Sequence, residues 1–434
     1  MDKSKLKRYF QFLLIVIAAG SIYPLIYIRT GYQQTVLDVF GIEMTQLNIL
    51  YTALGFTFVA GYFPSGWIAD KFSAKWLLAV SMFATSLGGF WFAQIPSYSS
   101  VVIIFVIWGF FSVFTFWSAH MKLVKLLSTP AEEGRFFGIL DGGRGLIEAI
   151  LAAIAVIIFA ALIGGDAGGQ ENPRGALQGV IYMYAITMLV VSVLIAVFVK
   201  EDKDEVDAVK AEKAKQKKAT LKDSMEVFKN KLVYVMGAVI CMGYFVTWSQ
   251  FFMGGFLETS VGVSAVTVAT VMMIFVWMRP IGGMLGGYLA DKVGKINVVG
   301  GSIALASVCL ILLAIMPRGV NQAVFFTIVI IAGLLIFCIR GTYWSLLGDV
   351  RVRKINMGLA IGYISLFGYL ADILAPQASN FAFGNFEDGN AAYFIITAVI
   401  GAVGVLICIV FKGMTKNQPP LIEEEEEELV NLNN

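Results

Sequence analysis

Long apolar segments follow one another along most of this chain, and they constrain its fold more than any other feature. Of its 434 residues, 58% are apolar and 14% are charged, whereas soluble domains are about 45–50% apolar and about 25% charged. A helix needs about 20 apolar residues to cross the hydrocarbon core of a bilayer. We therefore expect an all-α membrane protein with twelve transmembrane helices, near residues 9–37, 44–69, 76–95, 99–123, 135–163, 179–199, 232–257, 264–290, 297–316, 322–347, 357–378 and 391–412.

A short motif occurs twice, about half a chain apart. Residues 66–71 read GWIADK and residues 287–292 read GYLADK. Each copy ends a long apolar segment and begins a short charged turn. Internal repeats of this length are typical of membrane transport proteins built from two related halves. The repeat therefore predicts two pseudo-symmetric bundles of six helices each.

The basic residues predict how the chain lies in the membrane. Lysines and arginines precede the first predicted helix and follow every even-numbered one, whereas the opposite loops carry only Arg174 and Arg318. Basic loops stay on the cytoplasmic side of a membrane, so both termini and the central loop should face the cytoplasm. No cleavable signal peptide is expected, because the first apolar segment is too long for one. We expect an integral protein of a bacterial inner membrane.

Charged stretches divide the chain into four parts. We expect an N-terminal six-helix bundle at 1–199, a charged cytoplasmic linker at 200–231, a C-terminal six-helix bundle at 232–412 and an acidic tail at 413–434. The linker lacks glycine and proline, which favours a partly helical segment. The tail holds six consecutive glutamates, a like-charge run that favours disorder. A docking role for the tail is the alternative.

Several classes of protein are excluded by what the sequence lacks. The four cysteines fall inside predicted helices, without the spacing of a metal site or a disulfide framework. The loop G-x-x-x-x-G-K-[ST], which holds phosphates in ATP-driven motors, is absent. We expect no enzyme activity, no metal and no cofactor.

The two motif copies and the predicted topology resemble the major facilitator superfamily. Its loop motif is G-x-x-x-D-[RK]-x-G-x-[RK]; the first copy here has Ser73 in place of the second glycine, and the second copy keeps Gly294. In the family this loop acts as a conformational latch. The resemblance implies a twelve-helix transporter with a central cavity. It also implies gating residues at Gly66, Asp70, Lys71, Gly287, Asp291 and Lys292.

Further segments resemble anion-transporting branches of that superfamily. Residues 26–32 are similar to the first-helix segment of organophosphate:phosphate antiporters, which carries a substrate-binding arginine, and Arg29 takes that position here. The seventh-helix arginine of that branch has no counterpart in 244–248. Residues 138–145 and 358–372 resemble bacterial nitrate/nitrite and organic-anion porters, without the Asn-Gly-Gly signature of nitrate carriers.

Ionisable residues inside the predicted helices are the main candidates for a site, because charge in a bilayer is costly and usually faces a cavity or a partner. Asp141, Arg144 and Glu148 are spaced i, i+3 and i+7, which places them on one helix face. One interpretation is an internally neutralised ladder that holds this helix in place. The other is that Arg144 binds an anion while a carboxylate carries a proton.

The predicted helices hold four arginines and three carboxylates, and this excess of positive charge favours an anionic or zwitterionic substrate. Arginine binds carboxylate or phosphate well because its planar guanidinium group donates two parallel hydrogen bonds and stays charged. Arg29 is the first candidate, since no acidic residue lies within a turn of it. Arg340 is another, with snorkelling to the interface as its alternative. Asp372 is a proton-carrier candidate, with a structural ion pair as its alternative.

Aromatic residues near these charges are candidates for contact with an organic substrate. Tyr23 and Tyr27 share the first predicted helix with Arg29, and Trp248 lies on the seventh. Packing against lipid or within the bundle is the alternative for each of them.

These features together predict secondary transport of a small organic anion by alternating access, with protons as the candidate coupling ion. The predicted substrate-binding residues are Arg29, Arg144, Tyr27, Tyr23, Trp248 and Arg340, and the predicted proton-coupling residues are Glu148, Asp141 and Asp372. We expect a monomer in the lipid bilayer, without nucleic acid. Export of drugs or metabolites is the alternative function, and a transporter-like solute sensor is a third.

Overall fold

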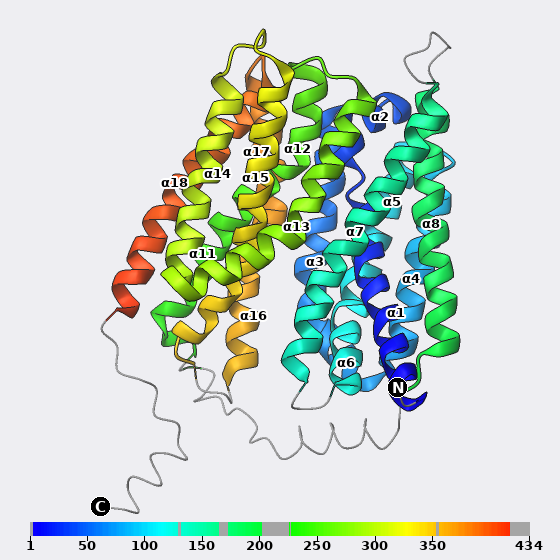
Figure 1. The fold of residues 1–434 in the computed structure, drawn as a ribbon, viewed down its shortest axis with the longest axis vertical. Coiled ribbons are helices and arrows are strands. Elements are labelled where there is room, and N and C mark those ends of the chain that lie inside the picture. The colour runs from blue at the N-terminus through cyan, green and yellow to red at the C-terminus, as the bar shows by residue number, and fades with distance from the viewer. Residues whose placement is uncertain are drawn as a thin grey trace, which may run out of the picture.

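The computed structural model describes residues 3–128, 132–164, 172–201, 225, 227–352 and 356–416. All the regular structure in this part of the chain is helical, because a helix pairs its own backbone polar groups and therefore tolerates lipid. Figure 1 shows the helices side by side, with the start of α1 at the bottom of the picture. We call this the lower end of the molecule and the opposite end the upper end.

The first bundle holds six spans, two of which consist of more than one helix. Its elements are α1 (Lys3–Ile26), α2 (Arg29–Phe40), α3 (Met44–Lys71), α4 (Ala74–Phe92), α5 (Tyr98–Gly109), η1 (Phe110–Thr115), α6 (Trp117–Leu127), α7 (Glu133–Ile163) and α8 (Pro173–Phe198). The first span joins α1 to α2, and the fourth joins α5, η1 and α6.

The second bundle repeats this plan with six further spans. Its elements are α11 (Lys231–Trp248), α12 (Gln250–Gly255), η2 (Phe256–Ser260), α13 (Ala265–Val293), α14 (Lys295–Ile315), α15 (Gln322–Thr342), η3 (Tyr343–Asp349), α16 (Met357–Gly368), α17 (Ala371–Asn385) and α18 (Gly389–Thr415). Among the described residues, ten spans are long and apolar enough to cross a membrane. The 28-residue α3 and the 19-residue α4 are not among these ten and complete the six helical spans of the first bundle. The predicted all-α membrane fold is confirmed.

Three of the interrupted spans break beside one cavity. α1 gives way to α2 at Tyr27-Ile28, α11 to α12 at Ser249, and α16 to α17 at Tyr369-Leu370. Residues beside all three breaks line the same cavity. Broken helices are tolerated in membrane proteins where the freed backbone borders a cavity, and such breaks accompany solute sites in transporters.

The two bundles touch at the upper end. There α2 packs against α12, and α3 packs against α17 (Figure 1). A Cβ on Gly254 of α12 would come within 2.6 Å of the Thr30 carbonyl oxygen, and one on Gly55 of α3 within 2.7 Å of the Asp372 carbonyl oxygen. Small residues let helix backbones approach closely in lipid, so these glycines allow the bundles to close.

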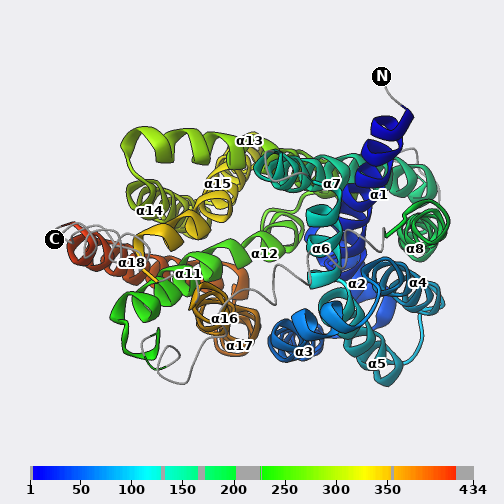
Figure 2. The same cartoon turned by 90° about the horizontal axis from the view of Figure 1, so that it is seen from below.

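A second contact between the bundles joins α7 to α13. Figure 2, seen from below, shows these two helices side by side across the boundary between the bundles. This contact brings the charged residues of α7 next to the second bundle.

The predicted domain boundaries stay a prediction. Most of the predicted linker, residues 202–224 and 226, lies outside the described residues, and so does the tail from residue 417 onward.

Asp388 precedes α18 at the upper end and joins three segments. Its carboxylate accepts hydrogen bonds from the Ala391 amide at 3.0 Å, the Arg318 guanidinium at 2.7 Å and the Ser260 hydroxyl at 3.2 Å. Burial alone raises the pKa of this carboxyl, but these hydrogen bonds and the Arg318 charge outweigh burial and lower the pKa of Asp388 below its usual value. The resulting stabilisation is present above the unfolded-state pKa and is lost as the pH falls through the folded-state pKa.

We predict that Asp388→Asn lowers the free energy of unfolding at neutral pH by about 0.5–1 kcal/mol, the range for a partly exposed ion pair. The difference from the wild type should shrink as the pH falls toward about 3, because Asp388 then becomes protonated. Thermal unfolding in detergent at several pH values measures both effects. Glu387→Gln changes an exposed neighbour and is the control; equal losses in the two variants would contradict this role.

Candidate functional site

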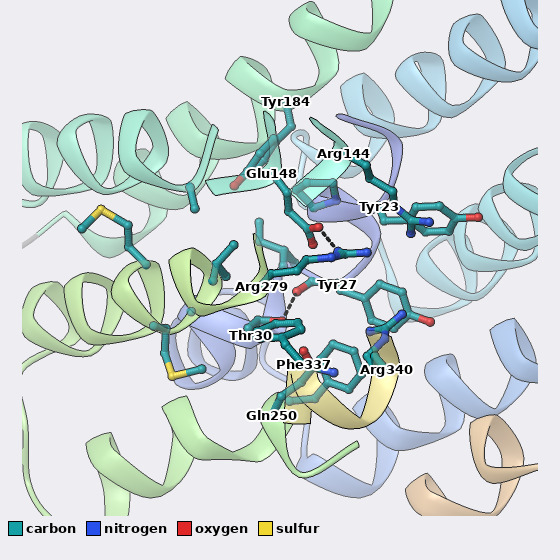
Figure 3. A pocket seen from close by; sticks show the side chains of 18 of the residues that line it. Tyr23, Tyr27, Thr30, Arg144, Glu148, Tyr184, Gln250, Arg279, Phe337 and Arg340 are labelled. Carbon is teal, nitrogen blue, oxygen red and sulfur yellow. Dashed lines mark hydrogen bonds and ion pairs between the residues drawn. The ribbon is translucent and has the colours of Figure 1, made fainter. Parts of the chain in front are cut away.

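A cavity of about 140 Å³ lies between the two bundles, at the helix breaks. Figure 3 shows its charged side chains converging from both bundles. Arg144 and Glu148 come from α7, Arg279 from α13 and Arg340 from α15. Three guanidinium groups and one carboxylate leave this lining with an excess of two positive charges.

One ion pair within the cavity crosses from the first bundle to the second. Glu148 accepts a hydrogen bond from Arg279, as the dashed line in Figure 3 marks. The side chains keep 22% and 14% of their surface exposed, so the pair stays accessible from the cavity. The carboxylate therefore neutralises one guanidinium only.

The other two cavity arginines lie against aromatic rings. The Arg144 guanidinium is 4.9 Å from the centroid of the Tyr23 ring, and the Arg340 guanidinium is 5.8 Å from that of Tyr244. Arg144 Nε is buried without a hydrogen-bond partner. Among the described ion pairs, neither arginine has a carboxylate partner. Both guanidiniums are available to an anion in the cavity.

Neutral polar groups complete the lining. They are Tyr23, Tyr27, Thr30, Tyr32, Tyr62, Tyr184, Tyr244, Gln250 and Tyr369. The Tyr23 hydroxyl donates to the Ser112 carbonyl at 3.0 Å, and the Tyr27 ring stacks on Phe251 with centroids 4.6 Å apart. Guanidinium forks beside several hydroxyls suit an anion that itself carries hydroxyl groups.

Arg29, a predicted substrate-binding residue, does not line this cavity. Its side chain is fully buried between the rings of Phe252, 4.2 Å away, and Tyr51, 5.0 Å away. The guanidinium donates to Gln33 Oε1 at 2.7 Å and to Asn48 Oδ1 at 3.0 Å. In this conformation, amide oxygens and aromatic faces surround the Arg29 charge.

Asn48 extends the contacts of Arg29 across the two bundles. Its side-chain amide donates to Ser379 Oγ and to Asn380 Oδ1 on α17, both at 2.9 Å. We call Arg29, Asn48, Ser379 and Asn380 the upper closure. All its hydrogen bonds between bundles join uncharged groups.

Of the three predicted proton-coupling residues, Glu148 lines the cavity and the other two do not. Asp141 is exposed on α7, about two helical turns before Glu148. Asp372 is buried at the start of α17 and accepts a hydrogen bond from Trp248 Nε1 at 2.9 Å. Trp248, a predicted substrate contact, is also buried outside the cavity lining.

The two copies of the repeated motif share one packing contact, at the C-terminal ends of α3 and α13. Lys71 Nζ lies 3.9 Å from the centroid of the Trp67 ring, and Lys292 Nζ lies 4.4 Å from that of Tyr288. Each lysine thus packs on the aromatic ring four residues before it. This match extends the sequence repeat to side-chain packing.

The remaining motif residues occupy different surroundings. Asp291 is exposed, and open space surrounds the position of a Cβ on Gly287. Gly66 lines a second cavity. The Asp70 side chain lies outside the described residues, and the gating roles stay predictions.

The second cavity, of about 550 Å³, lies at the lower end between α3 and α6 of the first bundle and α16 of the second. It shares Tyr62 and Trp117 with the central cavity. The Tyr62 ring stacks on Tyr369 across the bundles, with centroids 5.4 Å apart, and meets Trp117 edge-on at 5.8 Å. We call these three rings the aromatic layer; they lie between the two cavities.

Arg279 is one of the four arginines counted in the predicted helices, but the predicted site residues include neither Arg279 nor the aromatic layer. Arg279 carries a usable signal, because any arginine inside a membrane helix is a candidate. Tyr62, Trp117 and Tyr369 carry none, since aromatic residues face lipid, core and cavities alike.

The model of the Major Facilitator Superfamily matches residues 9–376. The chain belongs to this superfamily. It is 24% identical over 414 residues to Inner membrane protein YihN of Escherichia coli (strain K12), covering 94% of each chain. It is 23% identical over 391 residues to a hexuronate transporter of Bacillus subtilis (strain 168), covering 85% of this chain and 88% of that protein. It is 21% identical over 412 residues to a probable galactarate/D-glucarate transporter, GudP, of Escherichia coli (strain K12), covering 87% of each.

Solved structures show the same fold. A bacterial homolog of the human lysosomal transporter Spinster has a TM-score of 0.73 at 14% identity, over 97% of this chain and 100% of that chain. As a member of the Major Facilitator Superfamily, the chain is an integral membrane transporter and not an enzyme, as the sequence predicts.

We predict that Arg29→Met destabilises this superfamily member by about 2 kcal/mol, because the buried oxygens of Gln33 and Asn48 lose a charged donor. Thermal unfolding in detergent measures the loss, and Arg174→Met, at an exposed position, is the control. Affinity for anionic ligands should stay within about threefold, which corresponds to about 0.6 kcal/mol. Unchanged stability together with lost binding would instead support the role in substrate binding that the sequence predicts.

Proposed function

We propose that this transporter moves a small polyhydroxylated organic anion across the membrane by alternating access. The observation that supports this most is the excess of two positive charges in a cavity between the bundles. Arg144 and Arg340 belong to opposite bundles, so an anion held by both would connect the two halves. Each guanidinium can donate two parallel hydrogen bonds to one carboxylate.

The relatives support sugar acids as the substrate class. Two of them are named for hexuronate and for galactarate and D-glucarate, molecules that combine carboxylates with several hydroxyl groups. The tyrosine hydroxyls of the cavity match such hydroxyls as hydrogen-bond partners. Export of drugs or metabolites is the alternative function. A positively charged lining fits it poorly where the exported molecule is an apolar cation, because like charges repel.

The arrangement of the two ends supports alternating access. The upper closure joins α3 to α17 by side-chain hydrogen bonds, whereas a cavity of about 550 Å³ separates α3 from α16 at the lower end. Rocking of one bundle against the other around a central site would exchange these two arrangements. In this account the central cavity is closed above and leads downward through the aromatic layer.

The charges at the lower end support its assignment to the cytoplasm. Lys5, Lys7 and Arg8 lie on the first turns of α1, and Lys412 lies near the end of α18. Basic residues remain on the cytoplasmic side, and one relative is named as an inner membrane protein. We therefore place the lower end, with both termini, in the cytoplasm.

We predict that Arg144→Gln and Arg340→Gln each reduce uptake of D-glucuronate or galactarate into proteoliposomes by at least about 30-fold, because each removes a charged donor worth about 2 kcal/mol or more. Arg174→Gln, at an exposed position, should transport like the wild type. Normal uptake by both cavity variants would contradict the proposed site.

A second prediction concerns the upper closure. In the double variant Asn48→Cys/Ser379→Cys, oxidation should form a disulfide, because these side chains touch in the structure. The four native cysteines are buried and should remain reduced. Cross-linking should stop uptake, and a reductant should restore it. Full uptake by cross-linked protein would contradict a transport cycle in which the upper end opens.

A further inference from the structure

The ion pair between Glu148 and Arg279 places a carboxylate of the protein inside a cavity suited to carboxylates. Both residues line the cavity, and they belong to different bundles. Glu148 therefore occupies, on Arg279, the kind of position that an anionic substrate would take. We propose that Arg279 is a third anion-binding residue, that Glu148 occupies it in the unloaded cavity, and that the substrate displaces Glu148, which then takes up a proton. This inference rests on the proposed function.

The surroundings of Arg279 favour an exchange of partners over a fixed structural pair. The stem of Arg279 packs on Gly145 of α7, where an added Cβ would lie 3.2 Å from Arg279 Cγ, so the position of the stem does not depend on Glu148. The two side chains both keep some exposed surface. A ligand in the cavity can therefore reach Arg279 from the side that Glu148 leaves open.

Glu148 also lies within reach of a second guanidinium. Arg144 is four residues before it on α7, a spacing that puts two side chains on the same helix face. The groups around Glu148 come from several elements: Arg144 and Asp141 on its own helix, Tyr184 on α8, Arg279 on α13, Arg340 on α15, Tyr23 on α1, and Tyr27 in the break after α1. Three positively charged side chains therefore line the same cavity as Glu148.

Binding of an anion changes this balance. A substrate carboxylate on Arg279 removes the partner of Glu148 and adds a second negative charge beside it. Like charges in one site favour the protonated form of one of them. The proton comes from the solvent and stays on Glu148 while the substrate is bound, so one proton accompanies each anion, and no other group has to change its charge.

Isothermal titration calorimetry tests this exchange. It measures the affinity of the purified full-length protein in detergent for D-glucuronate and for galactarate between about pH 5 and about pH 8, where both probes stay ionised. The wild type should bind more tightly as the pH falls, by up to about tenfold per pH unit, the limit for uptake of one proton. Glu148→Gln, which keeps the shape without the charge, should bind with an affinity that changes less than about twofold over this range.

Two further variants keep the test decisive. Arg279→Gln should weaken binding at low pH by about tenfold, the effect of losing one charged hydrogen-bonding partner, and should also abolish the pH dependence. Glu258→Gln changes a partly buried carboxylate on η2 outside the cavity lining and should keep the pH dependence of the wild type. If Glu148→Gln does not fold, the pH dependence of binding by Arg279→Gln tests the exchange instead.

The outcomes separate this inference from the proposed function. A wild type that binds neither probe at any pH contradicts the proposed function. Two results would overturn the exchange and leave the anion site in place. One is a wild type whose affinity for each probe is the same at every pH. The other is a Glu148→Gln or Arg279→Gln variant that keeps the pH dependence of the wild type.

Discussion

Burial of positive charge inside the membrane is the constraint on which the rest of this structure depends. A guanidinium in hydrocarbon costs several kcal/mol unless partners compensate. The protein compensates its arginines in different ways: Arg29 has amide oxygens and two aromatic rings, and Arg279 has Glu148. Arg144 and Arg340 lie over single rings without a carboxylate among the described ion pairs. An anionic substrate would complete their compensation, which is why we place its site there.

The contacts between the bundles fit a protein that has to open and close. The upper closure relies on uncharged hydrogen bonds, each of which contributes only about 1 kcal/mol net. The aromatic layer at Tyr62 and Tyr369 joins the bundles by ring stacking alone. Such contacts can form and break without leaving a buried charge unpaired. The charged contact at Glu148 and Arg279 lies at the substrate cavity, where an incoming anion can replace one partner.

The sequence predicts the fold well and the site only in part. Three features can be recognised without a structure because they depend on local sequence alone. They are the twelve apolar segments, the repeat of GWIADK as GYLADK, and the alternation of basic loops. The placement of Arg29 and Arg144 depends on which face of a helix meets the cavity. Arg29 lies between the cavity-lining residues Ile28 and Thr30, but its guanidinium packs between the rings of Phe252 and Tyr51, and no sequence pattern fixes that direction. Pairing of Glu148 with a residue on α13 likewise depends on packing between halves.

Uptake of labelled D-glucuronate into proteoliposomes, in competition with unlabelled sugars, shows whether the net positive charge of the cavity selects the substrate. We predict that galactarate, which carries two carboxylates, inhibits uptake strongly, whereas galactose, which has hydroxyl groups but no charge, does not. Equal inhibition by galactose and galactarate, or no uptake of the labelled anion at all, would contradict it.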